Sequence, residues 1–557
     1  MPVDHGRMKT IISTVSALLV VTLAHAAPSL PEFSPDRFRA HVEFLADDLL
    51  EGRDTGSRGH EIAARYVAAQ LASYGLEPGG DDGTWFQRVT FQKTTRGADR
   101  GSVKISGPGG ERKFDHADNV LVGLHPREPN LDVSAPLVFV GYGLEDKLLG
   151  FDDYKGLDVR GAIVVVLRGF PKGMPSEEGA NASAMKGLNA QKHGAIGMLS
   201  VQTLESEKAF PWERILEYAN DPDCAWVQPD GQAFDEAASI RARGFLNGPA
   251  AEAAFAGAPR TLADIRAEAD KPSGMPRGFK LKTRAAVHGT ATWERVSSPN
   301  VIGILKGSDP ELSKQYTVLS AHLDGLGMRV AGADDANADR ILNGALDNAA
   351  GVATMLEVAR AAALDPDKAR RSMIFIATTG EEYGLLGADY YARHPSVPIG
   401  QIVGNVDLDM PLLLYPFTDV VAFGAGHSTI GPMVEKALAP MNIKLSPDPW
   451  PAQGIFTRSD HYQFVKQGVP AVFLATGTAN GGEKHWGEFL SGAYHSPRDD
   501  IAQQIDWQAG ARFVEANYRI TRAMSDADQR PLWFKGNYFG DTFAPGAPRA
   551  APSMANR

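Results

Sequence analysis

The sequence predicts an α/β domain with a central sheet in the C-terminal half of the chain. Several apolar runs there have the length of strands, and they lack the alternation that marks a strand with one solvated face. Continuous runs of this kind are typical of parallel strands buried on both faces. They cover residues 316–321, 373–380, 402–408 and 470–475. Between the first two runs, apolar residues recur at helical spacing from Val352 to Ala363, which indicates a helix.

Residues that can bind metal stand where these runs end. His322 follows the first run, Glu381 and Glu382 follow the second, Asp409 closes the third, and His495 lies in a loop after the fourth. In open α/β sheets, ligands bind beyond the carboxyl ends of the strands. We therefore expect these side chains to meet at one edge of the sheet.

Asp347 is expected at the same edge, although it opens the predicted helix. Asp347 and Asn348 stand just before the apolar helical positions. Short polar side chains at a helix start satisfy unpaired backbone N–H groups. We expect this pair to begin the helix and to bring the Asp347 carboxylate to the site.

The donor types in this set suit zinc. Zinc takes imidazole nitrogen and carboxylate oxygen, and a catalytic site keeps a position open for water. Two ions about 3.5 Å apart on a bridging carboxylate would hold both the attacking and the leaving oxygen. Of the neighbouring Glu381 and Glu382, one must bind metal and the other must stay free as a base. Each motif alone is common, but their order and their places at strand ends together predict a metal site.

The stretches around these residues resemble the motifs of peptidase family M28. This family of co-catalytic zinc peptidases includes bacterial leucyl aminopeptidases and glutamate carboxypeptidase. The resemblance implies a phosphorylase/hydrolase-like, three-layer αβα zinc exopeptidase domain with a mixed central sheet. The matching stretches are residues 320–325, 344–351, 379–387, 405–410 and 494–500.

The resemblance also implies a role for each site residue, with two zinc ions per chain. One zinc would be held by His322 and Asp409, and the other by Glu382 and His495. Asp347 would bridge the two ions, and Glu381 would be the general base. Asp324 would supply a carboxylate that orients the first histidine ligand.

Some assignments near the motifs remain alternatives. The fourth motif offers both Asp407 and Asp409, and the family pattern favours Asp409 because it stands just before a methionine. Residues 329–340 are expected to form a loop over the site, whose acids are either spare ligands or, as we favour, solvated charge. Asp460 and His461 are expected to support the ligands or to face the substrate. Trp486, in the pair His485-Trp486, either lines the pocket or packs in the core.

The resemblance implies a peptidase domain in two parts, separated by an inserted module. Residues 27–117 are expected to form its first segment, including a helix from Glu61 to Tyr74 that Gly75 ends. Residues 118–284 carry short Val-rich strands and, around Tyr154, resemble a mainly-β protease-associated (PA) domain, which would be a lid, a recognition surface or only a shield. Residues 285–528 would complete the peptidase domain, and the tail 529–557 has a Pro- and Ala-rich, disordered type of composition after Thr542.

The N-terminus resembles an export signal. Arg7 and Lys9 precede an apolar run, and Ala24-His-Ala26 has the small-x-small form of a cleavage site, so residues 1–26 are expected to be a signal peptide. A start at Met8 is the alternative. No further apolar stretch of spanning length follows, and Cys224 is the only cysteine, so we expect no intramolecular disulfide. A periplasmic or secreted bacterial protein fits these features, and the net charge of -11 disfavours nucleic acid.

These features predict an exported two-zinc exopeptidase that hydrolyses peptide substrates through a metal-bridging hydroxide. Family frequency favours an aminopeptidase, and a carboxypeptidase of the glutamate carboxypeptidase type is the alternative. An arginine would hold a free α-carboxylate, and Arg329, Arg458 and Arg498 all stand near the motifs. A glutaminyl-cyclase-like transferase, which uses one zinc, and an inactive receptor-like binding protein are less favoured, because the full ligand set is present.

Overall fold

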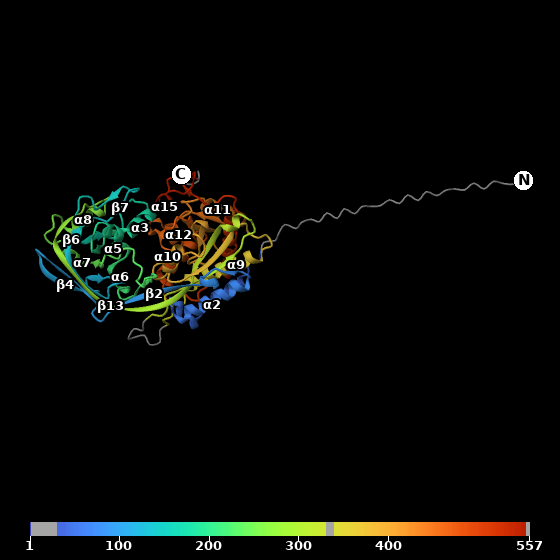
Figure 1. Ribbon diagram of the computed structural model, residues 1–557, viewed down its shortest axis with the longest axis horizontal. Helices are drawn as coiled ribbons and strands as arrows, with labels where there is room; N and C mark the ends of the chain where they lie inside the picture. The colour runs from blue at the N-terminus through green and yellow to red at the C-terminus, as the bar shows by residue number, and fades with distance from the viewer. Residues whose placement is uncertain (2–30, 330–338, 553–557) are drawn as a thin grey trace.

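The computed structural model describes Met1 and residues 31–329 and 339–552. The expected signal peptide, and Asp334 and Asp335 of the acidic loop, lie outside the described residues. The chain forms two units side by side, and the long strand β13 (Phe279–Leu305) runs through both (Figure 1). Among the described residues, no helix has the length and apolarity needed to cross a membrane.

The larger unit is built on a mixed sheet whose central strands are parallel. β14 (Tyr316–His322) lies between β15 (Ser372–Thr378) and β16 (Ile402–Asp407), and it is parallel to both. β19 (Ala471–Thr476) is parallel to β16 on the far side. Each of these strands matches one of the apolar runs, so the strand predictions are confirmed. Strands at the flanks run antiparallel to their inner neighbours, namely β13 beside β15, β2 (Phe86–Arg96) beside β13, and β17 (Asp419–Phe423) beside β19.

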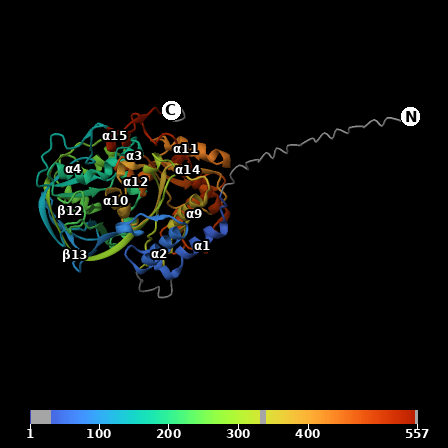
Figure 2. The same cartoon turned by 45° about the vertical axis from the view of Figure 1, so that its right-hand side comes forward.

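Helices cover both faces of this sheet, because successive strand residues point to opposite sides. In β14, Leu319 joins the core that includes helices α1 (Pro35–Leu45), α2 (Arg58–Ser73), α9 (Ala350–Leu364) and α14 (Trp507–Asp526). Its neighbour Val318 packs on the opposite face with residues of α10 (Leu386–Arg393) and α12 (His461–Lys466). The result is the expected three-layer αβα arrangement, with α9 and α14 together on one side (Figure 2).

Local sequence explains where the first helices begin and end. Ser57 caps α2 by accepting a hydrogen bond from the backbone N–H of His60 at 3.1 Å. Gly75, at a φ of +84°, follows the helix and donates to the carbonyl of Ala72. The helix predicted from Glu61 to Tyr74 is therefore confirmed.

The smaller unit has its own apolar core, which also takes in chain on both sides of the expected insertion. Val103 and Phe114 belong to this core, although they precede residue 118, and Val287 follows residue 284. They do so because β3 (Ser102–Gly107) pairs with β4 (Gly110–Asp115) and with β13. The other main elements of this unit are β5 (Val120–Val122), β6 (Asn130–Phe139), β9 (Ile163–Leu167), α3 (Ser176–Ala184), α4 (Lys186–Lys192), β10 (Gly197–Val201), α5 (Leu204–Ala209), α6 (Trp212–Glu217), β12 (Ala242–Leu246), α7 (Gly248–Ala254) and α8 (Leu262–Ala269).

The single cysteine lies in a strand that joins the sheet of the larger unit. Cys224 is in β11 (Asp223–Trp226), which pairs with β2, and it is half-buried. Burial raises the pKa of its thiol to about 12, so the thiolate is scarce at neutral pH. A nucleophilic role for Cys224 is therefore disfavoured.

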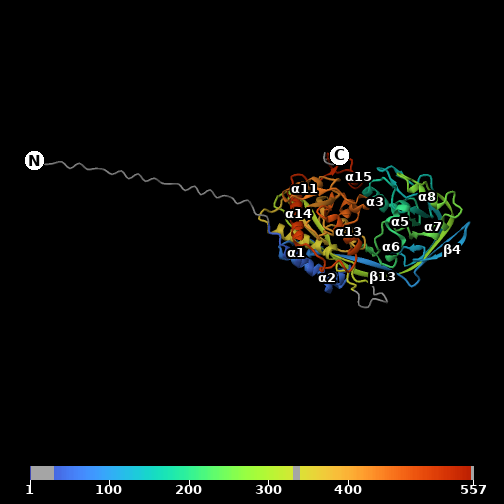
Figure 3. The ribbon, with the colours of Figure 1, turned by 180° about the vertical axis from the view of Figure 1, so that it is seen from behind.

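The C-terminal segment is ordered further than expected, because part of the stretch after Thr542 pairs with an earlier strand. β20 (Trp533–Phe534) pairs with β21 (Arg549–Ala550), and α15 (Tyr538–Phe543) lies between them in sequence. Trp533 and Phe539 are buried in the main core. Figure 3 shows α15 from behind, near α3 of the smaller unit. Composition could not reveal this pairing, because it depends on contact with Trp533 and Phe534, which precede the Pro- and Ala-rich stretch.

We expect Trp533→Ala to lower the free energy of unfolding by about 3–5 kcal/mol, the usual cost of removing a buried aromatic side chain. Trp533 is 1% exposed, and its indole N–H donates to the carbonyl of Gly468 at 3.0 Å. Urea unfolding followed by circular dichroism measures the change. Leu364→Ala, at a side chain that is 64% exposed, is the control and should change it by less than about 0.5 kcal/mol. Equal behaviour of the two variants would mean that the tail contributes nothing to the core.

Candidate metal centre

The carboxyl ends of the parallel strands bring the candidate ligands together. His322 ends β14, Glu381 and Glu382 follow β15, and Asp409 follows β16. His495 arrives from the loop after α13 (Gly482–Gly492), which itself follows β19. Strand pairing fixes how far along the sheet each ligand lies, since His322 is paired with Thr378, the last residue of β15.

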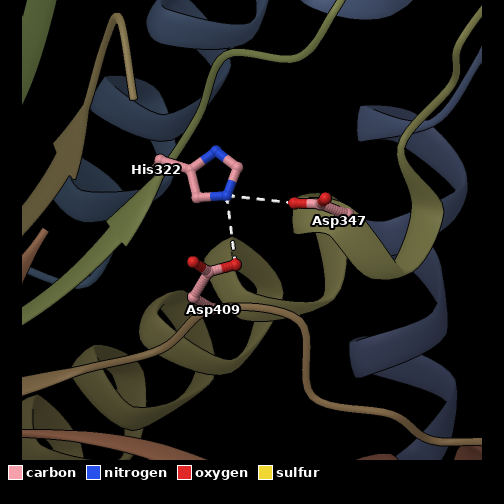
Figure 4. Close-up of side chains that lie close together, drawn as sticks. All are labelled: His322, Asp347 and Asp409. Atoms are coloured by element: carbon pink, nitrogen blue, oxygen red, sulfur yellow. Dashed lines mark hydrogen bonds and ion pairs between the residues drawn. The ribbon is translucent and has the colours of Figure 1, made fainter. Parts of the chain in front are cut away.

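The first group of ligand atoms surrounds the imidazole of His322. Its Nε2 lies 3.1 Å from Oδ1 of Asp347 and 3.3 Å from Oδ1 of Asp409. All three side chains are buried, and both carboxylates point at the same ring nitrogen (Figure 4). A second group forms around His495, whose Nε2 lies 3.4 Å from Oδ2 of Asp347 and 3.5 Å from Oε2 of Glu382.

Asp347 belongs to both groups. Its Oδ1 faces His322 and its Oδ2 faces His495, so the two oxygens of one carboxylate point at different imidazoles. Within each group the donor atoms lie within 4.8 Å of one another, a spacing at which they could share an ion. Glu381 joins His322 and Glu382 in a further group of this kind. The arrangement is that of two adjoining ligand sets joined by Asp347.

The backbone at Asp347 differs from the expected helix start. Asp347 and Asn348 lie in an irregular turn, Ala345–Ala349, and have non-helical φ and ψ. It is Asn348 that caps α9, because its Oδ1 accepts from the backbone N–H of Gly351 at 3.0 Å. The Asp347 carboxylate was therefore wrongly expected to share in capping, and its side chain points instead at the two histidines.

Asp324 supports the site in a different way from the one expected. The Nδ1 atom of His322 lies 3.2 Å from the backbone carbonyl oxygen of Asp324. The histidine is therefore oriented by the backbone of Asp324 and not by its carboxylate. When Nδ1 carries the proton and donates it to this carbonyl, Nε2 is unprotonated, and its lone pair faces Asp347 and Asp409. The buried carboxylate of Asp324 accepts from the backbone N–H of Glu381 at 3.1 Å and of Glu382 at 3.3 Å. It therefore positions the glutamate pair.

Asp407 and Asp409 have separate surroundings. Asp409 contacts His322, as described above, whereas Asp407 accepts from the hydroxyls of Ser320 at 2.5 Å and Ser459 at 2.7 Å. Ser459 Oγ is also 2.7 Å from Asp409, so this hydroxyl connects the two carboxylates. The geometry favours Asp409 as the ligand and makes Asp407 part of its support.

The other residues singled out from the sequence lie away from the ligand atoms. Asp460 accepts from the hydroxyl of Thr378, and Nδ1 of His461 lies 3.7 Å from Asp407. Both are fully buried, so they can support the site but have no access to a substrate. Trp486 is buried as well and donates its indole N–H to the carbonyl of Thr476 at 3.2 Å, which is a packing role.

Asp339, the described acid of the 329–340 stretch, and the nearby arginines are at the surface. Asp339 is exposed and accepts a local hydrogen bond from Ile341 N at 3.1 Å, as expected for solvated charge. Arg329 donates to the carbonyl of His495 at 2.8 Å, and Arg498 donates to the carbonyl of Gly492. Arg458 is exposed.

Two supporting residues escaped the sequence analysis. Asp499 is buried, and its carboxylate accepts from the backbone N–H groups of Leu346 and Asp347, each at 3.0 Å. It stands inside the last family-like stretch, so its place in that motif could have pointed to it. Arg53 is buried beneath the site, but an arginine in a Gly-rich turn has no pattern that separates it from a surface charge.

The crowding of carboxylates governs the electrostatics. Burial, reinforced by Asp347, raises the pKa of Glu382 to about 8, and burial together with Asp409 and Glu382 raises the pKa of Glu381 well above its usual range. Burial would lower the pKa of His322, but the carboxylates of Glu381 and Asp409 raise it above its ordinary value. Such a cluster is costly without positive charge. Nitrogen and oxygen donors with excess negative charge fit divalent zinc.

The edge of the αβα sheet holds buried imidazole and carboxylate donors, which are the ligand types of a zinc site. Residues 300–521 match the model of peptidase family M28. This region, about two fifths of the chain, therefore matches an M28 peptidase domain.

Curated relatives match parts of the chain, and a solved structure shares its fold. The chain is 23% identical over 351 residues to rat Aminopeptidase NAALADL1, covering 52% of this chain and 42% of that protein. It is 37% identical over 110 residues to the Alkaline phosphatase isozyme conversion protein of Escherichia coli, covering 19% and 29%. The chain thus spans less than half of these relatives. An aminopeptidase structure from Aneurinibacillus sp. strain AM-1 shares the fold, with 21% identity, a TM-score of 0.50, and coverage of 88% and 93%.

We expect Asp499→Ala to weaken zinc binding about 10- to 100-fold, the usual effect of removing a group that holds a ligand in place. The backbone N–H groups of Leu346 and Asp347 would lose their acceptor, and the turn that carries Asp347 would loosen. Competition with a chromogenic chelator measures the affinity. Asp500→Ala, at the half-buried neighbour, is the control and should bind zinc normally. Normal binding in Asp499→Ala would show that the turn holds its shape without this carboxylate.

Proposed function

We propose that the protein is an exported, two-zinc aminopeptidase that releases N-terminal residues from peptides. The observation that carries the proposal is that the two oxygens of Asp347 face two different histidines, His322 and His495. One zinc would be held by His322 and Asp409, the other by His495 and Glu382, and Asp347 would bridge them.

Charge balance supports two ions over one. Asp347, Glu382, Asp409 and Glu381 are close together and carry four negative charges when all are ionised. Two divalent ions offset that charge fully, whereas one ion leaves a buried surplus that must be removed by protonation. A two-ion site therefore lets every ligand carboxylate stay ionised at neutral pH.

Glu381 is the group that we assign as general base. When bound, zinc would polarise the scissile carbonyl, lower the pKa of the attacking water and stabilise the negative charge that develops on oxygen. Glu381 accepts the proton of that water and then delivers it to the leaving amine. The Asp324 carboxylate holds the backbone N–H groups of Glu381 and Glu382, so one glutamate can face a ligand position while the other stays free.

The surroundings of the arginines favour an aminopeptidase over a carboxypeptidase. A carboxypeptidase needs a cation that is free to hold the α-carboxylate of the substrate. The guanidinium groups of Arg329 and Arg498 are both engaged by backbone carbonyls. Arg458 is exposed and remains the best candidate for the alternative, an enzyme of the glutamate carboxypeptidase type. The names of the rat relative and the Aneurinibacillus structure also favour the aminopeptidase.

Other features complete the proposal. Residues 1–26 would direct export to the periplasm or the medium. The smaller unit would act as a PA domain that borders the site and restricts it to peptide ends or unfolded chains. A glutaminyl-cyclase-like transferase or an inactive receptor remains the weaker reading, because it would not need a second ligand set around His495.

Replacing the base and replacing the bridge should have different effects. We expect Glu381→Gln to keep two zinc ions per chain and to lower kcat at least about 100-fold, because only the proton acceptor is lost. Asp347→Ala should lose both ions, because each ligand set loses the carboxylate oxygen that faces its histidine. Metal analysis of purified variants and kcat on the same substrate measure the two effects. Substantial turnover in Glu381→Gln with metal still bound would rule out Glu381 as the base.

Metal content and end specificity can be tested together. We expect two zinc ions per chain, loss of activity on chelation and recovery on zinc addition, with hydrolysis of aminoacyl p-nitroanilides but not of N-blocked dipeptides with a free carboxyl end. A content of one zinc ion per chain would rule out the two-zinc mechanism. Activity only on the N-blocked dipeptides would instead establish the carboxypeptidase alternative.

A further inference from the structure

Arg53 is a buried cation that joins the N-terminal segment to the candidate metal centre. It ends the short helical turn Asp48–Arg53 and is 1% exposed. Its guanidinium donates to the backbone carbonyls of Leu323 at 2.9 Å, Asn343 at 2.6 Å and Gly344 at 3.1 Å, and also to that of Leu45. One side chain therefore connects three separate stretches of the chain.

Two of those stretches carry candidate ligands. Leu323 directly follows His322, and Gly344 begins the turn that leads to Asp347. A second set of hydrogen bonds joins the same segments. The side chain of Asn343 donates to the carbonyl of Ala46 at 2.9 Å and to Asp48 at 2.8 Å. The backbones that carry His322 and Asp347 are thus tied to each other and to the N-terminal segment through Arg53.

The local backbone leaves room for the guanidinium. Gly344 has a φ of +59°, and a Cβ there would lie 3.0 Å from Arg53 and 2.2 Å from the carbonyl oxygen of Asp347. Gly52, at a φ of +69°, would place a Cβ 2.3 Å from the carbonyl oxygen of Gly327. A side chain at either glycine would therefore push the Arg53 turn away from the ligand loops.

The charge of Arg53 suits this position. Burial lowers its pKa to about 10, while Asp499, Asp324, Asp347 and Glu382 act to raise it, so the group stays a cation at neutral pH. Asp324 and Asp499 are the two carboxylates that hold the ligand loops by their backbone N–H groups. Arg53 offsets part of the negative charge of these two supports, which the metal ions do not contact in the proposed site.

We propose that Arg53 is a positioning residue that sets the spacing of the His322 and Asp347 loops and so tunes metal affinity. It lies outside residues 300–521, which match the family model, and the inference rests on the proposed metal site. Lysine cannot replace it, because one ammonium group cannot donate in a planar fork to carbonyls on different segments.

The test compares Arg53→Lys with Arg371→Lys. Arg371 is equally buried at 1% exposure, but it lies at the opposite end of β15, where it bonds Gln315 at 2.9 Å and the carbonyl of Met524 at 3.3 Å. We expect both variants to lose thermal stability. Only Arg53→Lys should weaken zinc binding, about 10- to 100-fold by chelator competition, and change the visible absorption of the cobalt-substituted protein.

Normal zinc affinity and a normal cobalt spectrum in Arg53→Lys, with stability lowered as in Arg371→Lys, would reduce Arg53 to a packing role and overturn the inference. The wild-type measurements separate this result from failure of the proposed function. If the wild-type protein binds no zinc, the proposed function fails first, whatever the variants do.

A second measurement needs no variant. Coupling between two sites is reciprocal, so zinc added to the metal-free wild-type protein should slow amide hydrogen exchange at residues 45–55. Exchange around Met524, which Arg371 contacts, serves as the internal control and should not change. Unchanged exchange at residues 45–55, with zinc bound, would overturn the inference even where Arg53→Lys fails to fold.

Discussion

The burial of several carboxylates against two histidines, at one edge of an apolar sheet, is the constraint on which this structure depends. Gathering like charges out of water is unfavourable unless positive charge and hydrogen bonds compensate. The surrounding residues supply this compensation in layers. Backbone N–H groups are directed at Asp324 and Asp499, hydroxyls at Asp407, and the guanidinium of Arg53 lies beneath them. The candidate ligands therefore need two kinds of partner, positive charge at the site and a fixed polar frame around it.

The parallel strands make such a frame possible. Their carboxyl ends lie at the same edge of the sheet. The residue that follows each strand is therefore at that edge without a long connecting loop. His322 illustrates this, because its backbone is still paired with β15 while its ring already faces Asp347 and Asp409. The irregular turn at Asp347 is the exception, and it is the segment that most needs outside support from Asp499 and Arg53. Regular pairing positions some ligands, and buried polar contacts position the rest.

The sequence predicted the features that depend on local pattern. The central strands, the helix Arg58–Ser73 and the gathering of His322, Asp347, Glu382, Asp409 and His495 follow from apolar runs and from residues at their ends. Prediction from the sequence failed where a long-range contact determines the position of a side chain. The Asp324 carboxylate accepts from the backbone of Glu381 and Glu382. The Asn348 side chain donates to the carbonyl of Leu408, and Arg53 is buried against Leu323 and Asn343. All these partners are far away in sequence. The short strand Arg549–Ala550 was missed for the same reason, since it forms only by pairing with Trp533 and Phe534.

The connection between the two units bears on how a substrate would reach the site. A single strand, β13, pairs with β6 in the smaller unit and with β2 and β15 in the larger one, so no flexible linker separates them there. Polar contacts reinforce this join, from Trp226 to Asp389 at 2.8 Å and from Tyr538 to Asp146 at 2.6 Å. A hinged lid would have to break these bonds each time it opened. In the proposed function, where the smaller unit borders the site, these contacts favour a fixed wall over a hinged lid.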